Sequence, residues 1–196
     1  MRKKDHIRLA LADKTTLTSL DAYAIDYNSV PRFGLDNLDT STTICNKKWQ
    51  FPFFINAITA GGEECNKINQ DFMEVSKACG IEFFPGSYSP ALKDKNDEAA
   101  YPKGYSMNLG LDKDPNLILD AIENTKAQYI QLHTNPLQEI VMPEGDHNFE
   151  SWLSTLTEVS KKSPIPVILK ETGFGMNEET IKLAIDLNLA AVDVSG

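Results

Sequence analysis

The sequence predicts an α/β protein with a parallel sheet, and two features of the chain carry that prediction. From about residue 49 onward, six short apolar runs alternate with helix-length amphipathic segments. Strands separated in this way need crossover connections and therefore run parallel. Polar side chains also follow each run directly, as expected where a barrel builds its active site at the carboxyl ends of all its strands. We therefore favour an incomplete (β/α)8 TIM barrel over an open sheet, which would gather polar groups at one switch point.

The first two strands are predicted over residues 51–57 and 81–84. A proline near the start of the first strand is tolerated there, because a missing N–H costs least at a strand end. The helix between the two strands has four apolar positions on one face: Ile68, Phe72, Val75 and Cys79. Gly80 then ends this helix.

The next two strands are predicted over residues 105–107 and 128–132. Between them, Asp114 and Pro115 form a good helix start, since an N-cap carboxylate satisfies free amides and proline suits the first turn. The second of these strands runs into the polar sequence His-Thr-Asn-Pro-Leu-Gln-Glu at residues 133–139.

The last two strands are predicted over residues 166–169 and 190–194. The helix before them has one apolar face, formed by Phe149, Trp152, Leu153, Leu156 and Val159. Asn177 is placed to cap the helix that joins the two strands, whose first turn is acidic.

The strand count indicates an incomplete barrel. A full barrel has eight strands and takes about 250 residues, whereas this chain has 196 residues and six predicted strands. We expect a partial barrel domain over residues 49–196. Residues 1–48 show no sustained apolar period and are expected to form an N-terminal extension, with a short helix over residues 7–12.

Composition excludes several classes of protein. Hydrophobic residues make up 41% of the chain, enough for one sizeable core. A net charge of −9 argues against nucleic acid or an anionic membrane as partner. No apolar run reaches the roughly 18 residues that span a bilayer, and no secretory segment follows the start, so a cytoplasmic protein is expected. Three widely spaced cysteines predict reduced thiols.

The polar strand ends are the candidate site. Lys170 could meet a phosphate or an electron-rich ring, or simply pair with a neighbouring carboxylate. Glu139 and Glu144 could hold Mg²⁺ or lie in a solvated loop. His133 could transfer a proton or donate to a phosphate, or be an ordinary polar strand end. No GxSxG, Walker or HExxH motif is present. The residues alone thus suit an anionic ligand and leave the reaction open.

Several ordered segments carry a resemblance to a known family. They are Asn56-Ala57-Ile58-Thr59, Gly86-Ser87, Asn108-Leu109-Gly110, residues 133–139 and 142–146, Lys170-Glu171-Thr172-Gly173-Phe174-Gly175 and Val192-Asp193-Val194-Ser195-Gly196. In these segments the chain resembles the N-terminal portion of the type 2, flavin-dependent isopentenyl-diphosphate delta-isomerases. The resemblance implies a barrel that holds FMN at its mouth. Reduced FMN, formed with NADPH, then acts as acid–base cofactor in isoprenoid biosynthesis.

The resemblance also implies roles for residues. The FMN contacts would be Ala57, Ile58, Thr59, Ser87, Asn108, Lys170 and Ser195. The substrate diphosphate would be bound by Arg2, Lys3, His6, His133, Asn135 and Gln138. Gln138 and His133 are the catalytic candidates, and Glu139 would hold Mg²⁺. A homo-oligomer, tetrameric or octameric, is expected from the same resemblance.

Departures from the family pattern leave two alternatives. Ile58, Ala60 and Thr134 replace residues that the family usually has at these positions, and the chain stops before the later glycine-rich FMN-phosphate loops. One alternative is another FMN-dependent barrel, such as a 2-hydroxy-acid oxidase. The other is an inactive truncated remnant. If nothing follows Gly196, weak FMN retention and little isomerase activity are expected.

Overall fold

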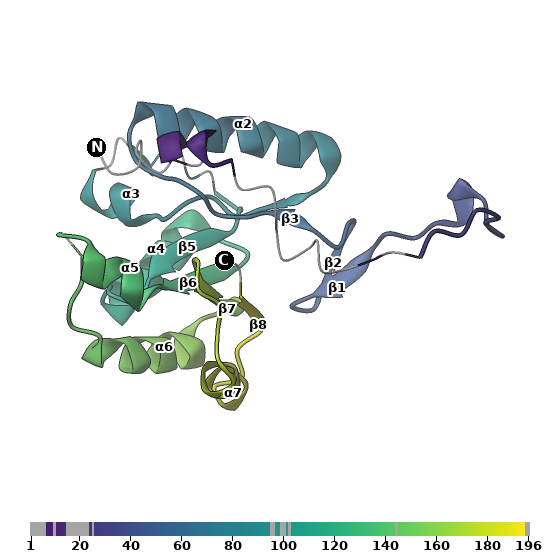
Figure 1. Cartoon of the computed structure of the whole chain (residues 1–196). Coiled ribbons are helices and arrows are strands. Elements are labelled where there is room, and N and C mark those ends of the chain that lie inside the picture. Colours follow the sequence, from purple (N-terminus) through teal and green to yellow (C-terminus); the bar gives the residue numbers. More distant parts are fainter. Residues whose placement is uncertain are drawn as a thin grey trace.

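The computed structural model describes residues 7–9, 11–14, 24, 26–94, 97–98, 101, 103–143 and 145–194. Residues 7–9 and 11–12 are helical, in agreement with the short helix expected near the start of the chain. Most of the remaining described chain forms parallel strands with helices around them, α2 on one side of the strands and α6 and α7 on the other (Figure 1).

Six parallel strands follow one another in chain order and form two groups. The first group pairs β3 (Phe54–Ile55) with β4 (Glu82–Phe83). The second contains, in this order, β5 (Met107–Gly110), β6 (Ile130–Thr134), β7 (Val167–Glu171) and β8 (Ala191–Asp193). The Tyr88 amide donates to the Asn108 carbonyl over 2.7 Å, so the chain leaving β4 runs beside β5. The six predicted strands are confirmed, although β3 is shorter than expected and β5 begins two residues later.

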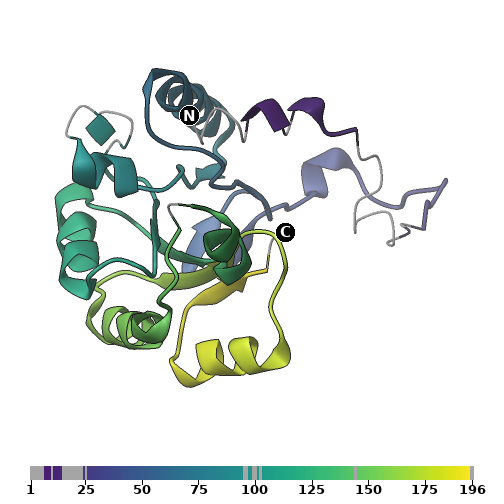
Figure 2. The same cartoon turned by 60° about the vertical axis from the view of Figure 1, so that its left-hand side comes forward.

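Helices connect these strands and lie around them. The long ones are α2 (Glu63–Cys79), α4 (Pro115–Thr125), α6 (Glu150–Lys162) and α7 (Glu178–Asp186); the short ones are α3 (Ser89–Lys93), α5 (Pro136–Val141) and the 3-10 turn η2 (Leu35–Asn37). Figure 2 shows the long helices following one another in an arc, from blue through green to yellow, with the strands inside it. This is the arrangement of a barrel that is built over part of its circumference.

The predicted helix ends are confirmed by their hydrogen bonds. The Asp114 carboxylate accepts from the Asn116 amide over 2.8 Å at the start of α4. The Asn177 side chain accepts from the Thr180 amide over 2.9 Å at the start of α7. Gly80 ends α2 in the left-handed conformation, with φ of 66°. Each side chain or turn satisfies a backbone group that the helix itself leaves unpaired.

The strands separate two apolar clusters because successive side chains point to opposite faces. On the outer face, Leu109, Leu132 and Leu169 pack with residues of α4 and α6 such as Ile122. The inner face holds a smaller aromatic cluster, made by Trp49, Phe84, Tyr129 and Ile168. The inner positions nearer the carboxyl ends of the strands are polar instead.

One predicted helix face is wrong. The apolar stripe of α2 was expected to be buried, but Val75 is 47% exposed and Cys79 is exposed as well. The buried residues of α2 are Cys65, Asn69 and Ser76. The physical reason is that α2 covers only the two short strands β3 and β4, which are too narrow to bury its whole stripe.

The N-terminal region contains an unpredicted β-hairpin. Strands β1 (Thr42–Ile44) and β2 (Lys47–Trp49) are antiparallel, and Cys45 and Asn46 between them have φ of 50° and 62°. Positive φ at both central residues is the geometry of a two-residue hairpin turn. Strands of three residues are too short to show an alternating pattern, so no periodic signal predicts this hairpin. The hairpin places Trp49 inside the barrel, where its indole donates to the Tyr129 hydroxyl over 2.9 Å.

Within the described residues, no helix combines the length and the apolar character that crossing a membrane requires. Cys45, Cys65 and Cys79 are free thiols, as their spacing predicted.

Candidate active site at the carboxyl edge of the sheet

Four inner positions at the carboxyl edge of the sheet lie side by side. Strand pairing aligns Gly110 with His133, His133 with Lys170, and Lys170 with Asp193. Because parallel strands end at the same edge, residues far apart in the chain become neighbours here. A glycine at 110 leaves room for the imidazole, since a Cβ there would lie 3.2 Å from His133 Nε2.

Lys170 and Asp193 form a buried ion pair. Lys170 Nζ lies 3.3 Å from Asp193 Oδ2, and the two side chains are 6% and 11% exposed. The ammonium also donates to the Glu171 carbonyl over 3.0 Å. A charge this deeply buried is tolerated only when it is paired and hydrogen-bonded. Of the two possibilities for Lys170 left open by the sequence, the ion pair is present, and its partner is Asp193.

A chain of side-chain hydrogen bonds crosses the strand ends from Asp193 to His133. Asn56 and Gln131 both donate to Asp193 Oδ2, over 2.8 and 3.2 Å. Gln131 also donates to Asn56 Oδ1 over 3.1 Å and accepts from Asn108 Nδ2 over 3.1 Å. Asn108 Oδ1 lies 2.7 Å from His133 Nδ1. These bonds connect Asn108, His133 and Lys170, three residues assigned to the site from the sequence.

The loop after β6 begins the short helix α5. Asn135 caps it, accepting from the Gln138 amide over 2.8 Å. The Asn135 amide group donates to the Thr172 hydroxyl over 2.7 Å and to Gln138 Oε1 over 3.4 Å. Asn135 thus ties the loop after β6 to the loop after β7 and holds Gln138 beside it.

Glu139, in the first turn of α5, is hydrogen-bonded to Asp146, which lies in the segment after this helix. Glu139 Oε2 accepts from the Asp146 amide over 2.8 Å, and Asp146 Oδ2 accepts from the Trp152 indole over 3.2 Å. Gly145 packs so closely on the Glu139 backbone that a Cβ would overlap it. The Glu139 carboxylate is therefore held against the backbone of Asp146, and both residues line the same cleft.

The loop after β7 is folded around a carboxylate. Glu171 Oε2 accepts from the amides of Gly173, Phe174 and Gly175, over 2.6, 2.7 and 3.3 Å. Consecutive amides that converge in this way form an anion-binding nest, and here the protein's own carboxylate occupies it. The loop that carries Thr172 toward Asn135 is fixed as a result.

A cleft of about 580 Å³ opens at this edge of the sheet. It is lined by Ser87, Ser89, Pro90, Lys93, Asp94, Asp97, Asp112, Lys113, His133, Glu139, Gly145 and Asp146. Its lining carries five carboxylates against two lysines and one histidine, so a cation or several further positive groups would be needed before a diphosphate could enter.

Two tyrosines support the wall of this cleft. The Tyr101 hydroxyl donates to the Ser87 carbonyl over 2.5 Å, and its ring packs edge-on against Tyr88. Burial raises the pKa of Tyr101 far above its ordinary value, with the nearby Asp97 carboxylate acting in the same direction. Burial also raises the pKa of Tyr88. Both phenols are neutral at physiological pH, so Tyr101 remains a hydrogen-bond donor.

The residues predicted after the first strand do not line the cleft. Thr59 is buried, and its hydroxyl donates to Cys65 Sγ over 3.0 Å in α2. Ala57 packs against the inner aromatic cluster, and Ile58 is 63% exposed. Their link to His133 is indirect: the Ala57 amide donates to Asn56 Oδ1, which belongs to the hydrogen-bonded chain described above. Arg2, Lys3, His6, Glu144 and Ser195 lie outside the described residues.

Two residues of the site were not assigned from the sequence. Gln131 lies inside an apolar run that was interpreted only as a buried strand, and Asp193 was quoted only as part of a motif. Strand alternation would have indicated both: Gln131 is two residues from His133 and shares its face, and the register places Asp193 beside Lys170.

No three His, Cys, Asp or Glu residues come together as a metal site anywhere in the part of the chain that the structure describes. Glu139 and Asp146 both line the carboxyl-edge cleft. Mg²⁺ bound to substrate phosphates needs only one or two carboxylates from the protein. These two side chains fit that smaller requirement.

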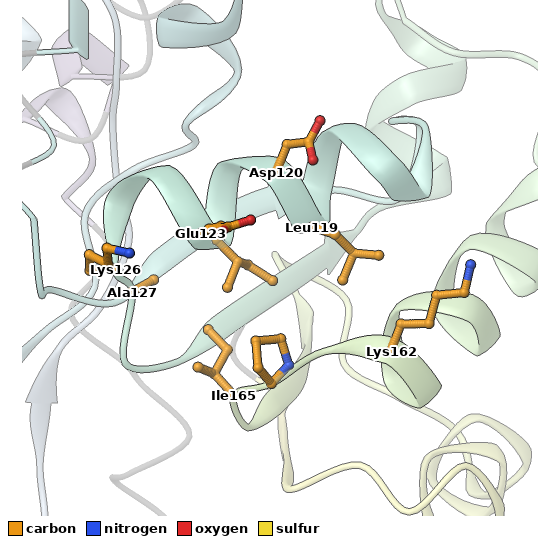
Figure 3. Close-up of a pocket in the computed structure, with 9 residues that line it drawn as sticks. Leu119, Asp120, Glu123, Lys126, Ala127, Lys162 and Ile165 are labelled. Carbon is orange, nitrogen blue, oxygen red and sulfur yellow. The ribbon is translucent and has the colours of Figure 1, made fainter.

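A second cleft, of about 560 Å³, lies at the opposite edge of the sheet. Figure 3 shows its walls, formed by α4 on one side and by the end of α6 with the following segment on the other. Its residues are Leu119, Asp120, Ile122, Glu123, Lys126, Ala127, Lys162, Pro164 and Ile165. None of the residues predicted for the site lies here. The carboxyl-edge cleft is therefore the candidate active site.

Fold and site together define a barrel protein whose polar site lies at the carboxyl ends of its strands. Solved structures agree with this fold. A mandelate oxidase variant with 2-hydroxy-phenylacetamide matches 83% of this chain and 53% of its own, with a TM-score of 0.54 and 14% identity. A variant with a monooxide FMN adduct covers the same fractions, with a TM-score of 0.51 and 14% identity. The predicted partial (β/α)8 barrel is confirmed.

Sequence relatives are more specific. The chain is 39% identical over 201 aligned residues to the isopentenyl-diphosphate delta-isomerase of Streptococcus mutans serotype c, and 37% identical to that of Streptococcus gordonii. Both alignments cover 100% of this chain but only 61% and 60% of the relatives, so the chain spans about three-fifths of their length. No family model matches. Along its whole length the chain is thus homologous to isopentenyl-diphosphate delta-isomerases, as the motifs predicted.

Proposed function

We propose that this chain forms part of an isomerase that interconverts isopentenyl and dimethylallyl diphosphate, in isoprenoid biosynthesis, with reduced FMN as acid–base cofactor. The observation that carries the proposal is the convergence of Asn108, His133 and Lys170 at one edge of the sheet, beside a cleft that contains Glu139. The homology to named isomerases supports the same substrate.

The carboxyl edge suits a flavin by the chemistry of its donors. Lys170 supplies a buried ammonium, and Asn108 supplies a buried amide on the same inner face. A flavin ring system presents carbonyl oxygens and ring nitrogens, which such groups bind and polarise. Ser87 lies on the cleft wall, where a hydroxyl can bind the same ligand. When bound, reduced FMN would supply the acid–base chemistry at the alkene.

The remaining groups suit the diphosphate end of the substrate. His133 and Lys113 are positive or proton-bearing groups of the cleft lining, and Glu139 is held in place by the Asp146 amide. We assign Mg²⁺ to Glu139, because the acidic lining repels a diphosphate unless a divalent cation bridges them. Arg2, Lys3 and His6 are proposed as further diphosphate contacts, and Gln138 as the catalytic group nearest the hydrocarbon.

Turnover under anaerobic conditions tests the proposal. The protein is incubated with FMN, NADPH, Mg²⁺ and isopentenyl diphosphate, and formation of the dimethylallyl isomer is followed by chromatography. Product that requires FMN is the expected result with a form as long as its relatives. Absence of product from that longer form would contradict the proposal. Oxidation of a 2-hydroxy acid instead would favour the oxidase alternative.

A matched pair of variants isolates the role of Glu139. Glu139→Gln keeps the size of the side chain but removes the charge that would bind Mg²⁺. We expect it to lower Mg²⁺-dependent turnover by about tenfold or more, while flavin binding followed by fluorescence quenching stays unchanged. Glu150→Gln, on the exposed first turn of α6, serves as control. An unchanged Mg²⁺ dependence in Glu139→Gln would remove Glu139 from the metal role.

A further inference from the structure

We propose that Gln131 is a positioning residue that fixes the tautomer of His133 through the Asn108 amide. The neutral imidazole has one N–H donor and one acceptor nitrogen, and the hydrogen bond made by one nitrogen decides which is which. The inference concerns the protein before any ligand binds and does not depend on the substrate proposed above.

The orientation of the Gln131 side-chain amide is fixed by two neighbouring groups that can only accept hydrogen bonds. Gln131 Nε2 lies 3.2 Å from the Asp193 carboxylate and 3.1 Å from Asn56 Oδ1. The identity of Asn56 Oδ1 is itself fixed, because it accepts the backbone amide of Ala57 over 2.8 Å. A backbone N–H cannot reverse its role. The NH2 group of Gln131 must therefore face Asp193 and Asn56, and its carbonyl oxygen must face Asn108.

The donor and acceptor roles of Gln131 also determine those of Asn108 and His133. Gln131 Oε1 is an acceptor, so the Asn108 group 3.1 Å away is the NH2 donor. Asn108 Oδ1 then faces His133 Nδ1 at 2.7 Å, and two acceptors at that distance would repel each other. His133 Nδ1 must carry hydrogen. In the neutral ring, Nε2 is the acceptor nitrogen.

Burial makes this orientation costly to reverse. Gln131 is fully buried and Asn108 nearly so, and rotation of either amide would leave donors facing donors without water to replace them. For the diphosphate substrate, a step that does rest on the proposed function, Nε2 can donate to a phosphate oxygen only when His133 is an imidazolium. Gln131 would thereby decide the charge state in which His133 binds.

NMR of the ¹⁵N-labelled chain without ligand tests the inference. Spectra are recorded from about pH 8.5 upward, until the shifts of the two ring nitrogens no longer change and the imidazole is neutral. The His133 signals are identified by their loss in His133→Gln. We expect the Nδ1–H tautomer to exceed the Nε2–H tautomer by at least about tenfold. A majority of the Nε2–H form in the unmodified chain would overturn the inference before any further variant is made.

Variants in the Gln131–Asn108–His133 chain distinguish a positioning role of Gln131 from a general structural role. Gln131→Met keeps the length of the side chain but ends its hold on Asn108, so the tautomer ratio should fall to about one or below. Gln128→Met changes an exposed glutamine three residues earlier and should leave the ratio unchanged. Asn108→Ala removes the last link and should have the same effect as Gln131→Met, which provides a second test if the first variant does not fold. A folded Gln131→Met or Asn108→Ala protein that keeps the original ratio of His133 tautomers would refute the proposed role of Gln131.

Discussion

The two clefts of this protein have nearly the same volume, about 580 and 560 Å³, but opposite surroundings. The carboxyl-edge cleft is lined mainly by polar and charged side chains of the segments that follow strands. The opposite cleft lies between helices and has more apolar residues in its lining, among them Leu119, Ile122 and Ile165, beside two acidic residues and two lysines. Volume therefore does not distinguish a site from a gap between helices. The position of a cleft relative to the carboxyl ends of the strands does distinguish the two.

The largest expected effect is at the carboxyl edge. Lys170→Met leaves the Asp193 carboxylate buried without its cation, and we expect the free energy of unfolding to fall by about 3–5 kcal/mol in urea titrations. Replacing both partners, as in Lys170→Met with Asp193→Asn, removes the unpaired charge but keeps an acceptor for Asn56 and Gln131, so it should recover much of the loss. Lys182→Met breaks an exposed ion pair with Asp186 and should cost less than about 1 kcal/mol. Similar losses at both pairs would remove the distinction between the buried pair and the surface.

The opposite cleft should matter for stability alone. Ile122→Ala truncates a buried side chain that lines this cleft. It should lower the free energy of unfolding by about 2–4 kcal/mol, because a cavity remains. Flavin and diphosphate binding measured by calorimetry, well below the melting midpoint, should not change. Ile185→Ala, exposed on α7, is the control and should have little effect on either quantity. A selective loss of ligand binding in Ile122→Ala would indicate a functional site in this opposite cleft and would contradict the assignment of the site to the carboxyl edge.

A close backbone contact beneath the carboxyl-edge cleft gives the third prediction. A Cβ on Gly86 would overlap the carbonyl of Thr59, whereas a Cβ on Gly34 would meet nothing nearer than 3.9 Å. Gly86→Ala should therefore cost about 1–3 kcal/mol by forcing the two segments apart. Gly34→Ala should change stability by less than about 0.5 kcal/mol. Thermal melts of the two variants side by side would show whether this contact sets the position of Ser87.

The smallest effect is expected away from both clefts, on β4. Burial raises the pKa of Glu82, and the nearby Lys47 only partly opposes this. A carboxyl whose pKa is raised in the folded state binds protons more tightly there than in the unfolded chain, so stability falls as pH rises through that range. Glu82→Gln should raise the melting midpoint slightly at pH 7. The gain should vanish below about pH 4, where Glu82 of the unmodified protein is protonated in both the folded and the unfolded state.

The sequence predicts much of the fold, and the reasons are local. Asp114, Asn177 and Gly80 act at helix ends through contacts with their own backbone neighbours, so their residue types suffice. His133 and Lys170 were predicted as strand-end groups, and the parallel arrangement makes them neighbours. The exposed stripe of α2 was not predictable, because burial depends on how wide the facing sheet is. The hairpin turn at residues 45–46 was missed, since its positive φ angles occur without glycine.

The least predictable part of the site was its hydrogen-bonded interior. Gln131, surrounded in sequence by apolar residues, gave the appearance of one imperfect position in a core strand. Its role emerges only when Asn56, Asn108 and Asp193, from three other strands or strand ends, are brought around it. Local patterns contain no information on such partners, whose separations in the chain reach 137 residues.

The chain has two tryptophans, and their positions make them separate optical reporters. Trp49 is sealed in the aromatic cluster inside the barrel, where its emission should be blue-shifted and change only on global unfolding. Trp152 is half-buried, and its indole donates to Asp146, a residue that lines the carboxyl-edge cleft. With Trp49→Phe, fluorescence would therefore report on that cleft alone, so occupancy of the site can be followed without labelling the protein.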